Sequence, residues 1–486
     1  MSAKQYRHWL SALALTLTLA GPAAALPQIQ TWETPNGARV LFVEAPDLPM
    51  LDLRLVFDAG SARDADQPGV AAMTADMLTQ GAGDWDADTL AERMEDVAAS
   101  LSTSALRDMG YVAIRTLTRE PALEMALETL TKVLSEPRFD PADLERLRRN
   151  ALTALRQAEQ DPGTVGQKAL YRAIYGDHPY AADPSGTPEG IAALTRDDLI
   201  AFHRRYYSAR NAVVAMVGAI DRAQAEAIAT RVTAGLPGGE SGGERAAPPP
   251  SVPGLTAASS EPVDFTSSQT HVLIGQPGMH RGDPDYYPLY VGNHVLGGSG
   301  LVSLLMHEVR EKRGLSYSVY SYFVPMRVDG PFLMGLQTKN DQANQAREVL
   351  LQTLGRFIAD GPSERELAAA KKNITGGFPL RIASNARVVE YLAMIGFYDL
   401  PLDHLDRFTG QIEAVTAEQV RDAFARRVHP ERLAVVTVGP GPDDVAGRPA
   451  GPMSNQAADQ VSNQAEDQVS NQAADQAAHH VAGRGD

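Results

Sequence analysis

The alternation of apolar and polar residues divides the first half of the chain into strands and helices. Residues 38–43, 51–57 and 109–117 alternate as half-buried strands do, and the apolar run 212–218 predicts a buried strand. Helices are predicted where apolar residues recur every three to four positions, or where Leu, Ala and Arg dominate. These predicted helices cover residues 67–80, 88–100, 120–134, 143–159 and 195–207. The mixture predicts an α+β fold.

The pattern breaks between residues 237 and 262, where Gly-Gly pairs, three consecutive prolines and paired serines predict a linker. The elements then repeat on its far side. Residues 194–218 align with 415–439 at a constant offset of 221, and residues 139–150 align with 362–373 at an offset of 223. We therefore predict a duplicated unit. Two similar lobes with an α/β-sandwich-like architecture are expected over the two ranges that flank the linker, 26–236 and 263–442.

The two ends of the chain differ in composition from its middle. Lys4 and Arg7 precede an apolar run over residues 9–20 and then three alanines, which predicts a cleaved signal peptide over residues 1–25. An uncleaved anchor is the alternative, but the run is shorter than the roughly 20 residues of a membrane span. We expect an exported, periplasmic protein with no stable membrane span. Residues 443–486 form a polar tail with three near-copies of the octapeptide SNQAADQV at residues 454–477, and such a composition predicts disorder.

Charge and cysteine content exclude several classes of function. The chain of 486 residues has 60 acidic and 44 basic residues, a net charge of -16. Because binding to nucleic acid requires a basic surface, we expect no nucleic-acid partner. There is no cysteine, which excludes disulfides, thiolate zinc sites and cysteine nucleophiles.

One stretch in the second half combines several local signals. It begins with a glycine turn at residues 297–300 and continues as a helical run with Leu301, Leu304, Leu305 and Val309 on one face. The run ends at Gly314, and residues 315–320 alternate like a strand. Arg310 near the helix end and Tyr317 on the strand are seven residues apart, so the turn between them could direct a cation and a phenol to one place. The alternative is that Arg310 pairs with Glu308 or Glu311 and that Tyr317 fills the core.

The segment REKRGLSYSV after GGSG resembles the second half of the pitrilysin/insulinase-type (M16, inverzincin) metallopeptidases. The resemblance covers residues 26–439 and implies M16-like lobes. It further implies that Arg310 and Tyr317, which match an Arg and a Tyr of that family, bind the substrate backbone and stabilise the tetrahedral intermediate.

Members of this family that cut peptides carry H-x-x-E-H on their first long helix. Two histidines bind zinc there, the glutamate activates the zinc-bound water, and a later glutamate completes the ligand set. The matching positions here are Ala72, Ala75 and Asp76, with Leu155 at the distal glutamate. Methyl groups neither ligate zinc nor accept protons, so we expect no zinc site and no cofactor in this chain.

These observations leave three hypotheses. The first is a non-catalytic subunit of a heterodimeric periplasmic M16 zinc peptidase, in which this chain supplies Arg310 and Tyr317 and a zinc-bearing partner carries H-x-x-E-H and cuts the peptide substrate. The second is a peptide-binding or scaffold pseudo-peptidase that acts without catalysis. The third is an autonomous metallopeptidase anchored by Asp76. The histidines His178 and His203 are expected to be structural or solvated.

Overall fold

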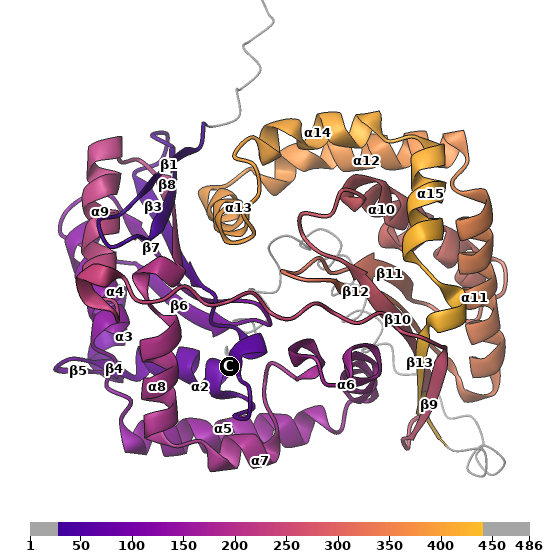
Figure 1. The fold of residues 1–486 in the computed structure, drawn as a ribbon, viewed down its shortest axis with the longest axis horizontal. Helices are drawn as coiled ribbons and strands as arrows, with labels where there is room; N and C mark the ends of the chain where they lie inside the picture. The colour runs from indigo at the N-terminus through magenta and orange to yellow at the C-terminus, as the bar shows by residue number, and fades with distance from the viewer. Residues whose placement is uncertain (1–27, 441–486) are drawn as a thin grey trace, which may run out of the picture.

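The computed structural model of the protein describes residues 28–440. The predicted signal peptide, 1–25, and the predicted polar tail, 443–486, lie outside this range. The described chain forms two halves, each built around its own sheet (Figure 1). No helix within residues 28–440 has both the length and the apolar character needed to cross a membrane.

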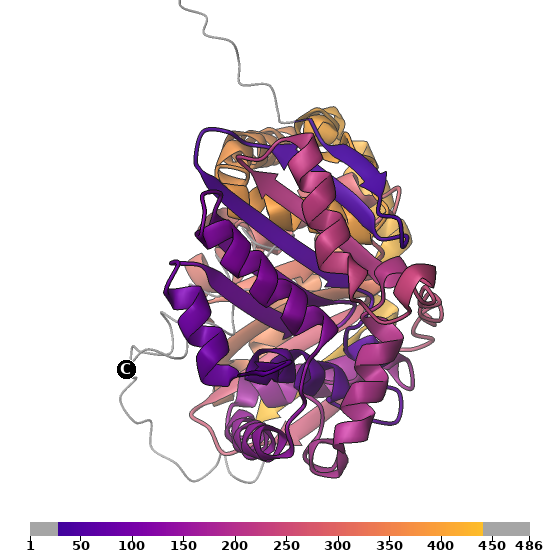
Figure 2. The same ribbon diagram turned by 90° about the vertical axis from the view of Figure 1, so that its left-hand side faces the viewer.

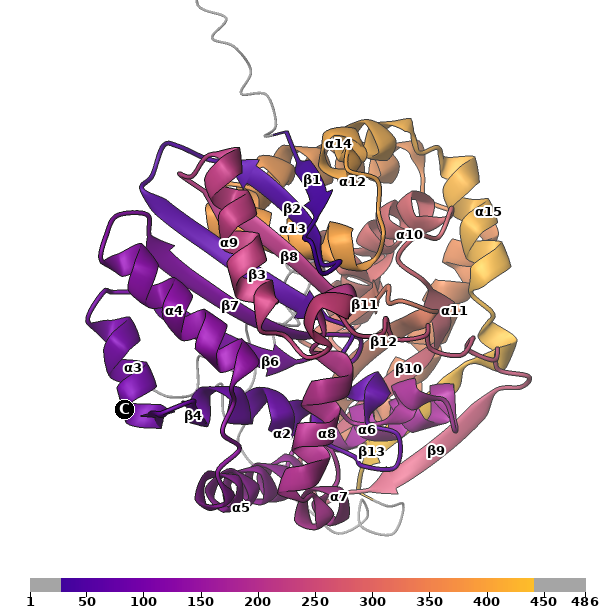
Figure 3. The ribbon, with the colours of Figure 1, turned by 60° about the vertical axis from the view of Figure 1, so that its left-hand side comes forward.

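The first half contains a six-stranded sheet in the order β1-β2-β8-β3-β7-β6 and a short hairpin, β4 with β5. Its strands are β1 (Gln30–Glu33), β2 (Arg39–Glu44), β3 (Met50–Phe57), β4 (Gly81–Ala82), β5 (Trp85–Asp86), β6 (Ser100–Ala105), β7 (Gly110–Leu117) and β8 (Ala212–Gly218). Its helices are α2 (Val70–Met77), α3 (Ala87–Glu95), α4 (Ala122–Ser135), α5 (Pro141–Ala158), α6 (Pro162–Tyr175), α7 (Pro188–Ala193), α8 (Arg196–Tyr206) and α9 (Arg222–Ala234). Helices α4 and α9 cover the outer face of the sheet, which Figures 2 and 3 show from that side.

The second half contains a five-stranded sheet in the order β11-β12-β10-β13-β9. Its strands are β9 (Ser259–Asp264), β10 (Gln269–Met279), β11 (Val319–Phe323), β12 (Gly330–Lys339) and β13 (Ala434–Gly439). Its helices are α10 (Tyr286–Asn293), α11 (Ala343–Asp360), α12 (Glu364–Arg381), α13 (Asn385–Phe397), α14 (His404–Ala414) and α15 (Ala417–Arg427).

The two sheets have the same topology, which confirms the predicted fold class and the duplication. The order β2-β8-β3-β7-β6 of the first sheet corresponds to β9-β13-β10-β12-β11 of the second. In each sheet one pair is parallel, β2 with β8 and β9 with β13, and the other pairs are antiparallel. Equivalent helices also begin alike. Thr195 starts α8 and Thr416 starts α15, each accepting a hydrogen bond from the third residue of its helix.

The inner face of each sheet is covered by a helix that belongs to the other half (Figure 1). Helix α13 packs against β8 and β3, and α6 packs against β13 and β10. Because helices cover both faces of the first sheet, all seven residues of β8 are buried. Glycines permit the close approach: a Cβ on Gly396 would lie 2.4 Å from Val213 Cγ1, and one on Gly166 would lie 2.5 Å from Leu273 Cδ1.

A buried carboxylate also joins the halves. Asp108 follows β6 and accepts hydrogen bonds from the hydroxyls of Tyr180 and Tyr398 and from the backbone N–H of Arg327 at 2.8 Å. Burial raises the pKa of Asp108. Since Tyr398 and Arg327 belong to the second half, this one side chain ties both halves together.

Several boundaries differ from the expectations. Strand β9 begins at Ser259, inside the predicted linker 237–262, because it pairs with β13 far along the chain. The predicted helix 88–100 ends at Glu95, since residues from Ser100 onward pair with β7. The glycines at 297 and 298 lie in a π-helical segment, His294–Gly298, rather than in a turn.

Candidate functional site

Arg310 and Tyr317 lie together on the surface of the second half. The guanidinium carbon of Arg310 is 6.0 Å from the centroid of the Tyr317 ring. Both side chains are exposed, Tyr317 with 61% of its surface accessible. The expectation that Tyr317 stands on a strand is wrong, because β11 begins at Val319. The predicted juxtaposition of a cation and a phenol is nevertheless present.

Backbone contacts fix the turn between these two residues. Gly314 has a φ of 62°, a conformation that glycine adopts readily, and its N–H donates to Arg310 O at 2.8 Å. Leu315 N–H donates to Val309 O at 3.0 Å. The hydroxyl of Ser316 donates to Gln337 O on β12 at 2.7 Å. The turn is therefore attached to a central strand of the sheet, which limits its freedom to move.

Neighbouring charges pair with one another and leave Arg310 without an acidic partner. Glu308 is buried and binds Lys312 and Arg313, each at 2.8 Å. The hydrogen bond from Lys312 is the main reason that the pKa of Glu308 falls to about 2. Glu311 binds His307 at 2.6 Å. Within residues 28–440 no carboxylate lies at ion-pair distance from Arg310, so the alternative of internal pairing with Glu308 or Glu311 is wrong.

The segment that leads to this site exposes apolar surface. Leu301 and Val302 have 59% and 82% of their surface accessible. The sequence pattern predicts Leu301 on one face of a helix with Leu304, Leu305 and Val309. Only the latter two are buried, because residues 300–302 form a short 3-10 turn before the helix begins.

The degenerate zinc-motif positions cannot hold the metal. Helix α2 packs against α5 and α8. On α2, Ala75 is fully buried, Ala72 is partly buried and Asp76 is exposed. On α5, Leu155 lies in the apolar cluster of the first half. A catalytic zinc site has about three protein ligands of nitrogen, sulfur or oxygen type, whereas this set offers one carboxylate.

Two histidines considered from the sequence are structural. His203 on α8 is buried, its Nε2 lies 3.1 Å from Leu134 O, and its ring stacks on Tyr207. His178 is also buried, with its Nε2 2.9 Å from Pro250 O.

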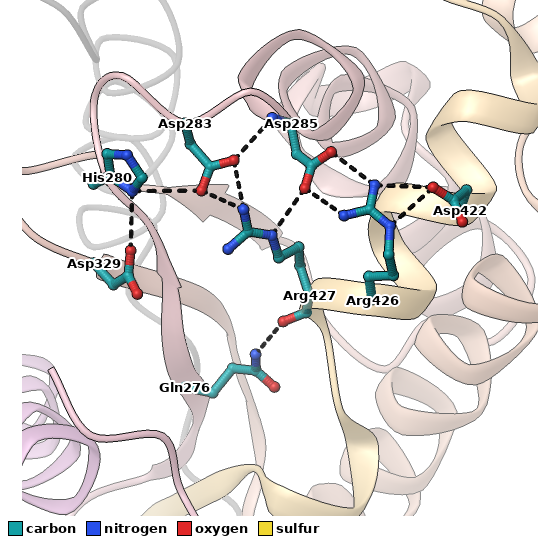
Figure 4. A network of polar contacts seen from close by, with 8 residues as sticks. All are labelled: Gln276, His280, Asp283, Asp285, Asp329, Asp422, Arg426 and Arg427. Atoms are coloured by element: carbon teal, nitrogen blue, oxygen red, sulfur yellow. Dashed lines mark hydrogen bonds and ion pairs between the residues drawn. The ribbon is translucent and has the colours of Figure 1, made fainter.

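A cluster that the sequence pattern did not single out lies after β10 (Figure 4). His280 Nδ1 is 3.5 Å from Asp283 Oδ2 and 3.3 Å from Asp329 Oδ1, an arrangement that could hold a metal ion. The buried Asp283 already accepts from Arg427 at 2.6 Å and from the N–H of Asp285. An arginine 144 residues further along the chain thus neutralises it, and the network attaches α15 to the loop before α10.

Comparisons with known proteins agree with this architecture. The model described as Insulinase (Peptidase family M16) matches residues 39–187, and the model described as Peptidase M16 inactive domain matches residues 193–374. A relative from Mycobacterium leprae named as an uncharacterized zinc protease is 26% identical over 417 residues, 84% of this chain and 90% of the relative. A non-peptidase homolog from Helicobacter pylori is 26% identical over 386 residues, 79% of this chain and 87% of that protein.

A solved structure is more similar in sequence. The structure described as a peptidase M16 inactive domain from Pseudomonas fluorescens is 38% identical, with a TM-score of 0.82. The alignment covers 85% of this chain and 98% of that one. The chain therefore belongs to the insulinase family of peptidases, M16, and its fold is that of the family's inactive-domain and non-peptidase proteins.

Proposed function

We propose that this chain is the non-catalytic subunit of a heterodimeric M16 zinc peptidase. It supplies Arg310 and Tyr317, and a partner subunit supplies zinc and the H-x-x-E-H motif. The observation that carries the proposal is the exposed Arg310–Tyr317 pair, which has no acidic partner among the described residues although four other charged groups around it are paired. An arginine left free in this way is available to a ligand.

The chemistry of the pair suits a peptide carbonyl. A guanidinium donates charge-assisted hydrogen bonds to an oxygen that becomes negative in the tetrahedral intermediate, and a phenol donates one more. Because the turn is attached to β12, the backbone that carries the two donors is held in place before the substrate arrives. Such preorganised donors stabilise the transition state more than the ground state.

The need for a partner follows from the positions on α2 and α5. Ala72, Ala75 and Leu155 offer no ligand, so the metal chemistry has to come from another chain. The likeness to a non-peptidase homolog supports this division. The apolar segment near the N-terminus supports export to a periplasm, where the two subunits would meet.

Kinetics of a reconstituted pair test the proposal. The chain is purified together with an H-x-x-E-H-bearing M16 relative from the same organism, and kcat/KM for peptide cleavage is measured. Arg310→Ala and Tyr317→Phe are each expected to lower kcat/KM by roughly 10²–10³, the effect of losing one oxyanion donor. Arg365→Ala is the control, because Arg365 is an exposed arginine on α12.

The same experiment distinguishes the second candidate function. Leu301 and Val302 expose apolar surface, which suits a peptide-binding module that acts without catalysis. If both variants form the complex and cleave at the wild-type rate, the transition-state role is excluded and the binding module remains. Light scattering of each complex shows whether the subunits have assembled.

A further inference from the structure

A small cavity lies in the second half, lined by residues of α10, α12, α13 and α14. Figure 1 labels these four helices. It has a volume of about 30 Å³. Since one water needs roughly 10–15 Å³ by the same measure, the cavity has room for about two waters or one planar group of similar size. It lies apart from Arg310 and Tyr317, neither of which lines it.

Two arginines face this cavity without an acidic partner. Arg281 follows β10, and its Nε is buried without a hydrogen-bond partner. Arg381 ends α12 and donates from Nη1 to the hydroxyl of Tyr290 at 2.6 Å. None of the described residues that line the cavity is acidic, and within residues 28–440 neither guanidinium has a carboxylate at ion-pair distance. Asp283, two residues after Arg281, is committed to Arg427.

Besides burial, the charges of both arginines lower the pKa of a histidine at or near the cavity wall. Burial, followed by the charge of Arg281, lowers the pKa of His404 to about 4. Burial, followed by the charge of Arg381, lowers the pKa of the nearby His294 to about 4. Both histidines are therefore neutral at pH 7, and the arginine charges remain uncompensated. Both arginines are partly buried, and a partly desolvated charge without a counter-charge is costly, so the site favours an anion.

The remaining walls limit what the anion can be. Tyr286 and Tyr391 add hydroxyl groups, while Phe323, Met394 and Phe408 add apolar surface. An apolar pocket with a few placed donors suits a small organic ion. A guanidinium is planar and binds carboxylates through two parallel hydrogen bonds.

We propose that this cavity binds a single carboxylate group between Arg281 and Arg381. The carboxylate belongs either to a small free acid or to the C-terminus of a peptide, and both sources present the same planar anion with a short apolar stem. The site is separate from the proposed catalytic role, so each can fail without the other.

Thermal unfolding of the purified full chain tests the site with sodium acetate as the probe. Sodium chloride at the same ionic strength is the reference. Because a ligand that binds only the folded state stabilises it, acetate is expected to raise Tm with concentration beyond the effect of chloride. Equal Tm curves for acetate and chloride in the wild-type chain, together with no effect of a peptide acid, would overturn the proposal.

Variants locate the effect. Arg281→Gln and Arg381→Gln are each expected to weaken the apparent acetate affinity about tenfold, the usual effect of losing a charge-assisted hydrogen bond. Arg407→Gln is the matched control, because Arg407 is an exposed arginine on α14, and its affinity should equal that of the wild type. Equal weakening in all three variants would contradict the proposal. Should a Gln variant fail to fold, Arg281→Lys retains the charge but loses the fork, and weaker binding is again expected.

The source of the carboxylate is identified with a tripeptide, offered as the free acid and as the C-terminal amide. Stabilisation by the acid and not by the amide identifies a peptide terminus as an occupant. Stabilisation by acetate alone identifies a small free acid.

Discussion

Arg310 and Arg313 are three residues apart on one turn, yet among the described residues Arg313 has a carboxylate partner and Arg310 has none. The reason is the π-helical geometry of residues 306–311, in which Lys312 N–H donates to the carbonyl five residues earlier, His307 O. This geometry brings Glu308 next to Lys312 and to Arg313, four and five residues on. Glu308 is thereby occupied, and within residues 28–440 no carboxylate lies at ion-pair distance from Arg310.

The α-helical spacing that the sequence pattern suggests does not predict that Glu308 pairs with both Lys312 and Arg313. The sequence could predict that the helix ends near Gly314, because a glycine after a helical run is a strong local signal. It could also predict that the turn after this helix brings Arg310 and Tyr317 together. The exposure of Leu301 depends on the 3-10 turn of residues 300–302, and the pairing of Glu308 with both Lys312 and Arg313 depends on the π-helical turn of residues 306–311. An ordinary α-helical pattern contains no information about either turn. The polar cluster around His280 likewise depends on Arg427, far away in the chain.

His203 makes folding sensitive to acid. Burial lowers its pKa to about 4, while the unfolded value is near 6.5. A depressed histidine contributes stability that is present above the unfolded pKa and is lost as the pH falls through the folded pKa. Denaturant unfolding of the wild type should therefore show a decreasing free energy of unfolding from pH 6.5 to pH 4. In His203→Gln this decrease should be smaller by about 3 kcal/mol. Identical pH slopes for the two proteins would contradict this role.

At the scale of elements, the close packing of α13 on the first sheet depends on Gly396. A Cβ there would lie 2.4 Å from Val213 Cγ1 and 2.8 Å from Leu41 Cδ1. Gly396→Ala is expected to destabilise the protein by about 1–3 kcal/mol, because the added methyl overpacks the contact.

The control for that change is a glycine in open space. A Cβ on Gly377 of α12 would meet nothing within 4 Å, so Gly377→Ala should stabilise by about 0.5–1 kcal/mol through the higher helix propensity of alanine. Chemical denaturation midpoints measure both changes. If both variants shift the midpoint in the same direction, helix propensity rather than packing dominates at Gly396.

The elements themselves were largely predictable, but their partners were not. Strand β8 and helix α8 could be located because their apolar periods and the Thr195 cap are local signals. The repeat of that cap at Thr416 made the duplication visible. The local pattern does not predict helix α6, and the predicted linker includes most of β9, because the strands that stabilise these two elements lie far away in the sequence.

At the scale of the whole molecule, the two halves share their cores. One apolar cluster contains Leu41 and Val213 of the first sheet together with Val389 and Leu392 of α13. A second cluster contains Leu170 of α6 together with strands of the second sheet. Each sheet therefore has one face that its own half does not cover, although the sequence suggests two lobes joined by a linker.

This exchange of helices predicts that neither half is stable alone. A fragment of residues 28–240 would lack α13 and expose Leu41 and Val213 to water, and it would retain α6 without the sheet that α6 covers. We expect such a fragment to bind a hydrophobic dye and to lack a cooperative unfolding transition. The intact chain should instead show one calorimetric transition, with equal calorimetric and van't Hoff enthalpies. Mixing the fragment with residues 241–440 should restore near-ultraviolet circular dichroism. A cooperative, dye-free fragment 28–240 would mean that the first half is an independent domain and that α13 only rests on it.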